Sequence, residues 1–212
     1  MAVAVLVTTT VPGVPTGASG ADPSPPRCHG APATIVGDSE YVLGTPGDDV
    51  IFAPDSEVHA FDGDDDICAA FLVYAGPGDD HVTMTGNGDT EVQGDAGNDR
   101  IVVGHGFAEI SGGPGGDTIT TGKGSQYVSG GQGRDQISTG PGRDRIDGQE
   151  DADVLRGGAG DDDVRGSGGS DDLHGGGGDD ALSGGRGDDV AYGGPGADSC
   201  ERTVETRRRC RG

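Results

Sequence analysis

Apolar and polar positions alternate over short stretches along most of the chain. In residues 85–201 an aliphatic residue returns every nine positions, with mainly polar residues on either side. Because successive side chains of a strand point to opposite faces, this pattern predicts short β-strands with one inward side chain each. β-Branched residues dominate the first half of this ladder and favour strands. The ladder consists of Val92, Ile101, Ile110, Ile119, Val128, Ile137, Ile146, Leu155, Val164, Leu173 and Leu182.

The residues between the predicted strands form a repeated unit rich in Gly and Asp. Residues 85–201 divide into thirteen units of nine without insertion or deletion, with the pattern Gly-Gly-x-Gly-x-Asp-x-apolar-x; 130–138 and 184–192 are intact copies. Glycine permits positive φ and close backbone approach, so this part predicts a turn whose carbonyl oxygens can face one centre. One copy alone would fit a flexible linker, but thirteen copies in phase with an aliphatic ladder favour a repeat fold.

The unit resembles the RTX, or haemolysin-type, calcium-binding nonapeptide repeat. The resemblance extends over about residues 44–201. It implies an all-β fold, a parallel β-roll (a β-helix-like solenoid) of 18-residue coils with short strands and Gly/Asp turns. It also implies Ca²⁺ ions between equivalent turns of adjacent coils, held by Asp carboxylates and turn carbonyls. This chemistry fits, because Ca²⁺ is a hard cation that takes six to eight oxygen ligands.

An 18-residue coil places alternate units on opposite edges of the roll. The first edge has Asp at every sixth position, whereas the second begins with Thr90, Ala108 and Gln126. Those three units also lack the first glycine, as does the unit of Thr139. We therefore predict that the N-terminal half of the second edge binds no calcium and closes through Thr or Val corners. The predicted ligands are Asp80, Asp99, Asp117, Asp135, Asp153, Asp171 and Asp189 on the first edge, and Asp144, Asp162, Asp180 and Asp198 on the second.

Pairs of adjacent aspartates on one edge give the candidate sites, about six on the first edge and three on the second. We expect the sites of Asp153 to be the weakest, since Gln149 and Asp151 replace glycines in its unit. Asp80 is displaced by one residue near Met84.

Residues 44–84 hold imperfect copies that predict further, irregular coils. Asp49, Asp65 and Asp80 keep the Gly-x-Asp-x-apolar core at spacings of 16 and 15, and Asp49 and Asp65 are additional candidate ligands. The β-rich run 33–36 is expected to cover the N-terminal end, because terminal repeats otherwise expose their core. We divide the chain into a signal peptide or disordered segment (1–27), an N-terminal cap with irregular repeats (28–84), the regular roll (85–201) and a C-terminal disulfide cap (202–212).

The composition makes this fold depend on a cation. The chain has 45 Gly and 37 acidic against 14 basic residues, a net charge of −23. So polar a chain cannot offset its conformational entropy by apolar burial alone, and we predict that it folds when calcium binds. The acid excess argues against nucleic acid and anionic membranes, and no apolar run reaches the roughly 20 residues of a membrane span. We expect a monomer that binds calcium ions, with an unidentified cell-surface or extracellular polymer as a further partner.

The cysteines and the N-terminus indicate secretion. Residues 2–7 are apolar and 19–21 have the small-x-small form of a cleavage site, so this segment is a signal peptide starting upstream of Met1, or a disordered tail. Cys28 and Cys68 belong to one end of the roll and Cys200 and Cys210 to the other, so we predict pairing within each end; free thiols are the alternative. Disulfides require an oxidising compartment, and we predict a secreted, extracellular protein.

Catalytic signatures are absent from the sequence. There is no Ser/His/Asp or Cys/His arrangement, and paired acids recur in register, which favours metal ligation over a catalytic dyad. The five histidines are scattered and are interpreted as surface residues, and 207–209 as a solvated basic tail rather than a binding patch. We predict a non-enzymatic structural or interaction module. The alternatives are the roll of a larger secreted enzyme of protease, lipase or epimerase type, and a surface adhesin. An ice-binding face is disfavoured, because the outward position after each ladder residue is not a regular row of threonines.

Overall fold

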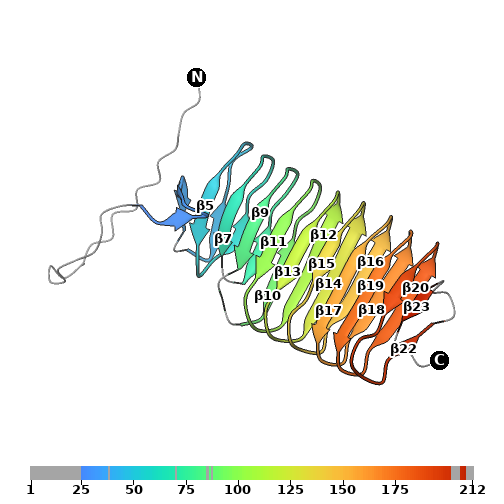
Figure 1. The fold of residues 1–212 in the computed structure, drawn as a ribbon. Helices are drawn as coiled ribbons and strands as arrows, with labels where there is room; N and C mark the ends of the chain where they lie inside the picture. The colour runs from blue at the N-terminus through green and yellow to red at the C-terminus, as the bar shows by residue number, and fades with distance from the viewer. Residues whose placement is uncertain are drawn as a thin grey trace.

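The structure is a computed structural model that describes residues 25–37, 39–69, 71–84, 86, 88–201 and the backbone of 206–208. Within these residues the chain forms strands and no helix, and the strands build two long parallel sheets. The sheets lie face to face and give an elongated roll whose coils follow the chain from one end to the other (Figure 1). The predicted all-β parallel roll is confirmed. The segment interpreted as a signal peptide lies almost entirely outside the described residues.

Successive strands alternate between the two sheets. The 11-stranded sheet consists of β3 (Ile35–Val36), β5 (Val50–Ala53), β7 (Asp66–Ala69), β9 (His81–Met84), β11 (Arg100–Val103), β13 (Thr118–Thr121), β15 (Gln136–Ser138), β17 (Val154–Ala159), β19 (Asp172–Gly177), β21 (Val190–Tyr192) and β23 (Thr206–Arg208). The 10-stranded sheet consists of β4 (Tyr41–Leu43), β6 (Glu57–His59), β8 (Leu72–Tyr74), β10 (Thr90–Gln93), β12 (Ala108–Pro114), β14 (Gln126–Gln132), β16 (Arg145–Glu150), β18 (Asp163–Gly168), β20 (Ala181–Arg186) and β22 (Ser199–Cys200). A separate antiparallel pair is formed by β1 (Arg27–Cys28) and β2 (Ala31–Pro32).

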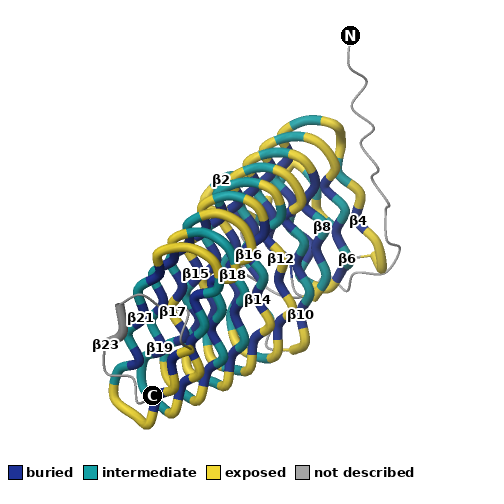
Figure 2. Tube along the Cα trace, turned by 90° about the vertical axis from the view of Figure 1, so that its right-hand side faces the viewer, coloured by how far each residue is buried: buried dark blue, intermediate teal, exposed yellow. Residues whose placement is uncertain are grey.

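The strand register confirms the predicted coil length in the regular array. Ile101 is paired with Ile119, and Ile119 with Ile137, across neighbouring strands of one sheet. Val82 and Ile101 are also paired, and their separation is longer than the regular coil by the single-residue displacement expected near Met84. The whole aliphatic ladder is buried between the two sheets, while the turns at both edges are the most exposed parts (Figure 2).

The imperfect repeats fold more regularly than expected. Ile35 is paired with Ile51, Ile51 with Ile67, and Ile67 with Val82, so these coils are shorter than the regular ones but complete. They also bury more apolar side chains per coil than the later units. In β5, β7 and β9 two residues point inward, as with Ile51 and Ala53, whereas Ile137 is the single buried apolar residue of β15. The irregular spacing is therefore absorbed in the turns, because the strands must stay in register.

The N-terminal end of the roll is not closed by a single covering strand, which the run 33–36 was expected to be. β3 is the terminal strand of the 11-stranded sheet and thus part of the first coil, while the β1–β2 hairpin lies beside it. A disulfide between Cys28 and Cys68 ties the hairpin to β7, which confirms this predicted pair. Cys200 is buried in β22 and is also disulfide-bonded; Cys210, its predicted partner, lies outside the described residues. No helix in the described part of the chain is long and apolar enough to cross a membrane.

Candidate metal sites along the two edges

The sixth-position aspartates of the first edge form one continuous column. Each backbone N–H donates to Oδ1 of the aspartate in the next coil, with N···O distances of 2.8–3.0 Å. All members of the column are buried. The column consists of Asp49, Asp65, Asp80, Asp99, Asp117, Asp135, Asp153, Asp171 and Asp189. The structure thus places every candidate of the first edge, including those from the imperfect copies, in a single line.

The second edge has a shorter column that begins at Gln126. The N–H of Gln126 donates to Oδ1 of Asp144 at 2.8 Å, and the same contact continues to Asp162, Asp180 and Asp198. Gln126 also donates from Nε2 to the carbonyl of Gly106 at 3.0 Å, so its amide fills a place in the turn. The two edges differ in structure as the sequence indicates; the corresponding difference in calcium binding stays a prediction.

The second carboxylate oxygen of these aspartates is buried without a hydrogen-bond partner. This holds for Oδ2 of twelve aspartates among the described residues: Asp65, Asp80, Asp99, Asp117, Asp135, Asp144, Asp153, Asp162, Asp171, Asp180, Asp189 and Asp198. Burying an ionised carboxylate without a partner is costly, so a cation or a proton is needed beside each one. Asp49 is different, because the N–H and hydroxyl of Thr45 donate to its Oδ2 at 2.7 and 3.0 Å.

The first glycine of each intact unit leaves a space beside that oxygen, which we call the glycine cradle. A Cβ at Gly130 would lie 2.2 Å from Oδ2 of Asp135 and 2.9 Å from the carbonyl oxygen of Gly148 in the next coil. A carboxylate oxygen of one coil and a carbonyl oxygen of the next therefore face a shared space without a side chain. Oxygen donors of these two kinds are what Ca²⁺ prefers. Corresponding cradles occur at Gly94, Gly112, Gly148 and Gly166 on the first edge and at Gly157 on the second; at Gly175 a Cβ would likewise lie 2.3 Å from Oδ2 of Asp180.

Three candidate ligands, Asp65, Asp80 and Asp144, have a side chain where the cradle would be. Ala60 and Ala75 stand five residues before Asp65 and Asp80, and both are fully buried. Thr139 stands five residues before Asp144, and its hydroxyl donates to the carbonyl of Gly157 in the next coil. The sequence signal for all three is the residue at the first position, but sequence reasoning applied it only to the second edge.

The backbone of the second edge changes at the same point. Gly158, Gly176 and Gly194, at the second position of their units, have φ of 102°, 114° and 109°. The equivalent Gly122 and Gly140 do not have positive φ. On the first edge even Gln149 adopts φ of 77° at this position, although left-handed backbone disfavours residues other than glycine. The left-handed turn thus accompanies the intact unit, and the units with Thr at the first position use another turn.

Burial raises the pKa of ten column carboxyls above that of an exposed aspartate: Asp65, Asp80, Asp99, Asp117, Asp135, Asp144, Asp153, Asp162, Asp171 and Asp180. Loss of solvation is the main cause, partly offset by the backbone N–H bond to Oδ1, and neighbouring aspartates raise several of them further. The pKa is about 7 for Asp117, Asp153 and Asp162 and about 6 for Asp99 and Asp135. Without metal, these groups therefore hold protons in the folded state at a pH where an unfolded chain has released them.

The stability of the metal-free roll is expected to fall as the pH rises. Because the folded pKa values are above the unfolded value of 3.8, the folded state binds more protons between these limits. The stabilisation is complete below about pH 4 and is lost as the pH passes through 6 to 7. Circular dichroism in EDTA should show more strand signal and a higher denaturant midpoint at pH 5 than at pH 7.5. A midpoint that is constant or increases over this interval would contradict the expectation.

Two facing parallel sheets with stacked, oxygen-lined turns define the chain as a calcium-binding β-roll. The RTX calcium-binding nonapeptide repeat family matches residues 84–106, 109–137, 129–164, 138–173 and 165–200, together more than half of the chain. The chain belongs to this family, and Ca²⁺ is the cofactor of its repeats. The orphaned carboxylate oxygens and the glycine cradles fit that ion. No curated protein matches the chain.

Proposed function

We propose that the chain is a secreted calcium-binding roll that folds when it binds calcium and serves as a structural or interaction module without catalysis. The observation that carries this proposal is the column of buried Oδ2 atoms facing glycine cradles. Bound Ca²⁺ would supply positive charge at each of these places. The recurrence of the acids in register supports a repeated metal-binding role rather than a single active site.

The glycine cradle predicts which aspartates hold calcium. On the first edge five cradles lie between consecutive coils, at Gly94, Gly112, Gly130, Gly148 and Gly166. On the second edge two do so, at Gly157 and Gly175. We therefore infer seven calcium sites between consecutive coils. The weakest candidates are then not the sites of Asp153, whose cradles are open, but the pairs Asp80–Asp99 and Asp144–Asp162, because Ala75 and Thr139 occupy their cradles.

An extracellular location is supported by the disulfides and by the calcium requirement. Cys28–Cys68 is formed, and disulfides persist in oxidising compartments. Weak calcium sites of extracellular modules match the high calcium concentration found there. We further propose that residues 28–84 act as a cap on which the regular roll of 85–201 stacks, with 202–212 closing the opposite end. Detection of the mature chain in culture medium, with its disulfides intact, tests this location.

Replacing Thr139 by glycine is expected to add a calcium site. The Thr139→Gly change removes the hydroxyl that donates to Gly157 and opens a cradle beside Oδ2 of Asp144. Isothermal titration calorimetry of the full chain should then count one more calcium ion than in the parent protein. The proposed function itself fails if the parent chain binds no calcium in this titration.

Thr121→Gly is the matched control on the same edge. It also opens a first position, but the sixth residue of that unit is Gln126, which has no carboxylate. Its calcium count should equal that of the parent chain. Equal counts for parent, Thr139→Gly and Thr121→Gly would show that the first-position side chain does not decide where calcium binds.

A further inference from the structure

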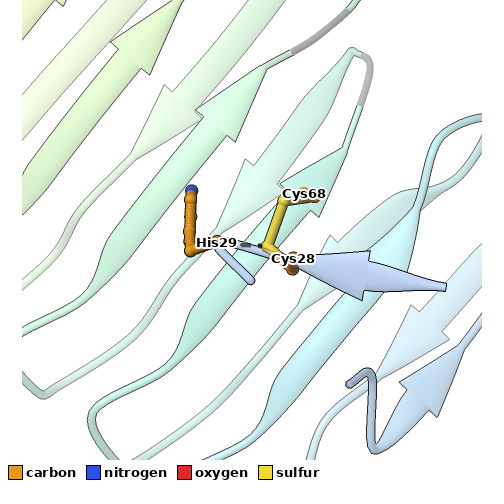
Figure 3. A group of neighbouring side chains, drawn as sticks. All are labelled: Cys28, His29 and Cys68. Atoms are coloured by element: carbon orange, nitrogen blue, oxygen red, sulfur yellow. Dashed lines mark hydrogen bonds between the residues drawn. A yellow bond between two sulfur atoms is a disulfide. The ribbon is translucent and has the colours of Figure 1, made fainter. Parts of the chain in front are cut away.

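A group of metal-ligating side chains lies outside both Asp columns, on the outer face of the 11-stranded sheet. His29, in the turn of the β1–β2 hairpin, is held over β7 and β9 next to the Cys28–Cys68 disulfide (Figure 3). Its ring stacks on that of His81, with 3.4 Å between ring centroids and 8° between planes. This differs from the expectation of scattered surface histidines, because two residues far apart in sequence meet here.

One carboxylate oxygen faces both rings. Oδ1 of Asp66 lies 3.0 Å from Nδ1 of His29 and 3.4 Å from Nδ1 of His81. The ligand atoms of the three residues all lie within 4.8 Å of one another. Asp66 and His81 are register partners on β7 and β9, so the sheet itself fixes their separation.

Both ring nitrogens of His29 have a polar partner. Nε2 lies 2.7 Å from the hydroxyl oxygen of Thr83, and Nδ1 lies 3.0 Å from Oδ1 of Asp66. Without metal, the carboxylate favours a proton at Nδ1, and the Thr83 hydroxyl can then donate to Nε2. A cation bound at Nδ1 would replace that proton, and Nε2–H would then donate to the Thr83 hydroxyl. A histidine whose second nitrogen donates to a fixed acceptor is a common feature of metal ligands.

We propose that His29, His81 and Asp66 bind a divalent first-row transition cation of the Zn²⁺ type. Two imidazole nitrogens and one carboxylate oxygen are typical ligands of Zn²⁺. Ligand atoms of a tetrahedral zinc site are about 3.4 Å apart, given metal–ligand distances of about 2.0–2.1 Å, and the two contacts of Asp66 Oδ1 have similar lengths. Because the two rings stack nearly parallel, they must tilt out of this arrangement before both Nδ1 lone pairs converge on one ion.

The site is chemically distinct from the calcium sites. Calcium prefers an all-oxygen shell, whereas two imidazoles favour Zn²⁺, Cu²⁺ or Ni²⁺. The nearby sulfur atoms of Cys28 and Cys68 are bonded to each other and supply no thiolate. The disulfide instead fixes the backbone of His29 above the sheet. Bound metal would therefore link the N-terminal hairpin to β7 and β9 through side chains as well as through the disulfide.

Zinc titration of the calcium-saturated, tag-free full chain tests the proposal. Excess calcium occupies the Asp columns, and calorimetry should then detect one equivalent of Zn²⁺. Co²⁺ in place of Zn²⁺ should give visible d–d absorption bands. Asp66→Asn and His81→Ala should each weaken zinc affinity by at least about tenfold, since each removes a ligand, and Thr83→Val by a similar factor through the ring orientation of His29.

His174→Ala is the matched control. His174 lies on the same sheet face, pairs with Asp172 at 3.2 Å and stacks on Tyr192, but no second histidine faces this pair in the described residues. Its zinc affinity should equal that of the parent chain, and calcium counts and circular dichroism should be unchanged in all four variants. The absence of zinc binding in the parent chain, or zinc affinity unaffected by both Asp66→Asn and His81→Ala, would overturn the proposal without affecting the calcium roll.

Discussion

Removal of calcium is expected to unfold most of the regular array, residues 85–201. In the calcium-free roll at neutral pH, stacked carboxylates such as Asp117, Asp135 and Asp153 lie buried with an unpaired oxygen each. Each such group costs several kcal/mol unless it is protonated or paired. From β13 onward the array buries one aliphatic residue in most units, worth about 1.5–3 kcal/mol, which is small beside the entropy of ordering nine residues. The metal-free array therefore lacks a sufficient driving force to fold.

The loss is expected to be uneven along the chain. The coils of residues 35–84 bury two apolar residues in several strands, and Met84, Ala53 and Ala69 add to their core. The Cys28–Cys68 disulfide ties them to the N-terminal hairpin, and Asp49 is satisfied by Thr45. Where Ala60 and Ala75 replace the first glycine, less of the stability depends on metal. Residual protection without calcium should thus be concentrated in the N-terminal coils.

Far-UV circular dichroism and hydrogen exchange, each with calcium and with EDTA, measure this prediction. The strand signal should fall strongly in EDTA and return when calcium, but not the same concentration of Mg²⁺, is restored; Mg²⁺ requires a stricter octahedral shell. Amides of residues 100–200 should exchange rapidly in EDTA. An unchanged spectrum in EDTA at pH 7.5 would refute folding coupled to calcium, and uniform exchange over both halves would refute the gradient.

Substitution of Gly130 by alanine is expected to remove one calcium site in the middle of the first edge. The added Cβ would lie 2.2 Å from Oδ2 of Asp135, so the carboxylate and the facing carbonyl of Gly148 must move apart. Gly130 has no positive φ, and the effect therefore comes from the lost space rather than from backbone strain. Overpacking of this kind costs about 1–3 kcal/mol. The loss of a bound ion adds to that cost.

Gly177→Ala provides the control within the same array. A Cβ at Gly177 meets no atom within 4 Å, and its φ is not left-handed. The calcium count and the unfolding midpoint of this variant should match those of the parent chain, whereas Gly130→Ala should lose one ion and unfold at a lower denaturant concentration. If both alanine variants bind calcium equally, the glycine cradle is not part of the site.

Much of the calcium roll could be predicted from the sequence alone, because a solenoid repeats the same strand and turn in every unit. Two nine-residue units make one coil, so Asp135 lies next to Asp117 and Ile137 next to Ile119 in the adjacent coil, as the strand register shows. The absence of carboxylates at Ala108 and Gln126 likewise marks where the second column begins. The N-terminal coils were harder to predict, since their shorter and unequal spacings conceal strands that nevertheless stay in register.

The sequence by itself determined the coil length, the inward ladder and the division into two edges, because each depends on a residue's position within a unit. Only the tertiary structure decided which carboxylate oxygens are left without partners. That outcome depends on how each turn folds around its carboxylate: Thr45 donates to Oδ2 of Asp49, whereas Oδ2 of Asp80 and of Asp135 meets no donor. It also brought His29 to Asp66, because a disulfide and a hairpin, neither of which follows the period, fold the N-terminus onto the outer face of the sheet.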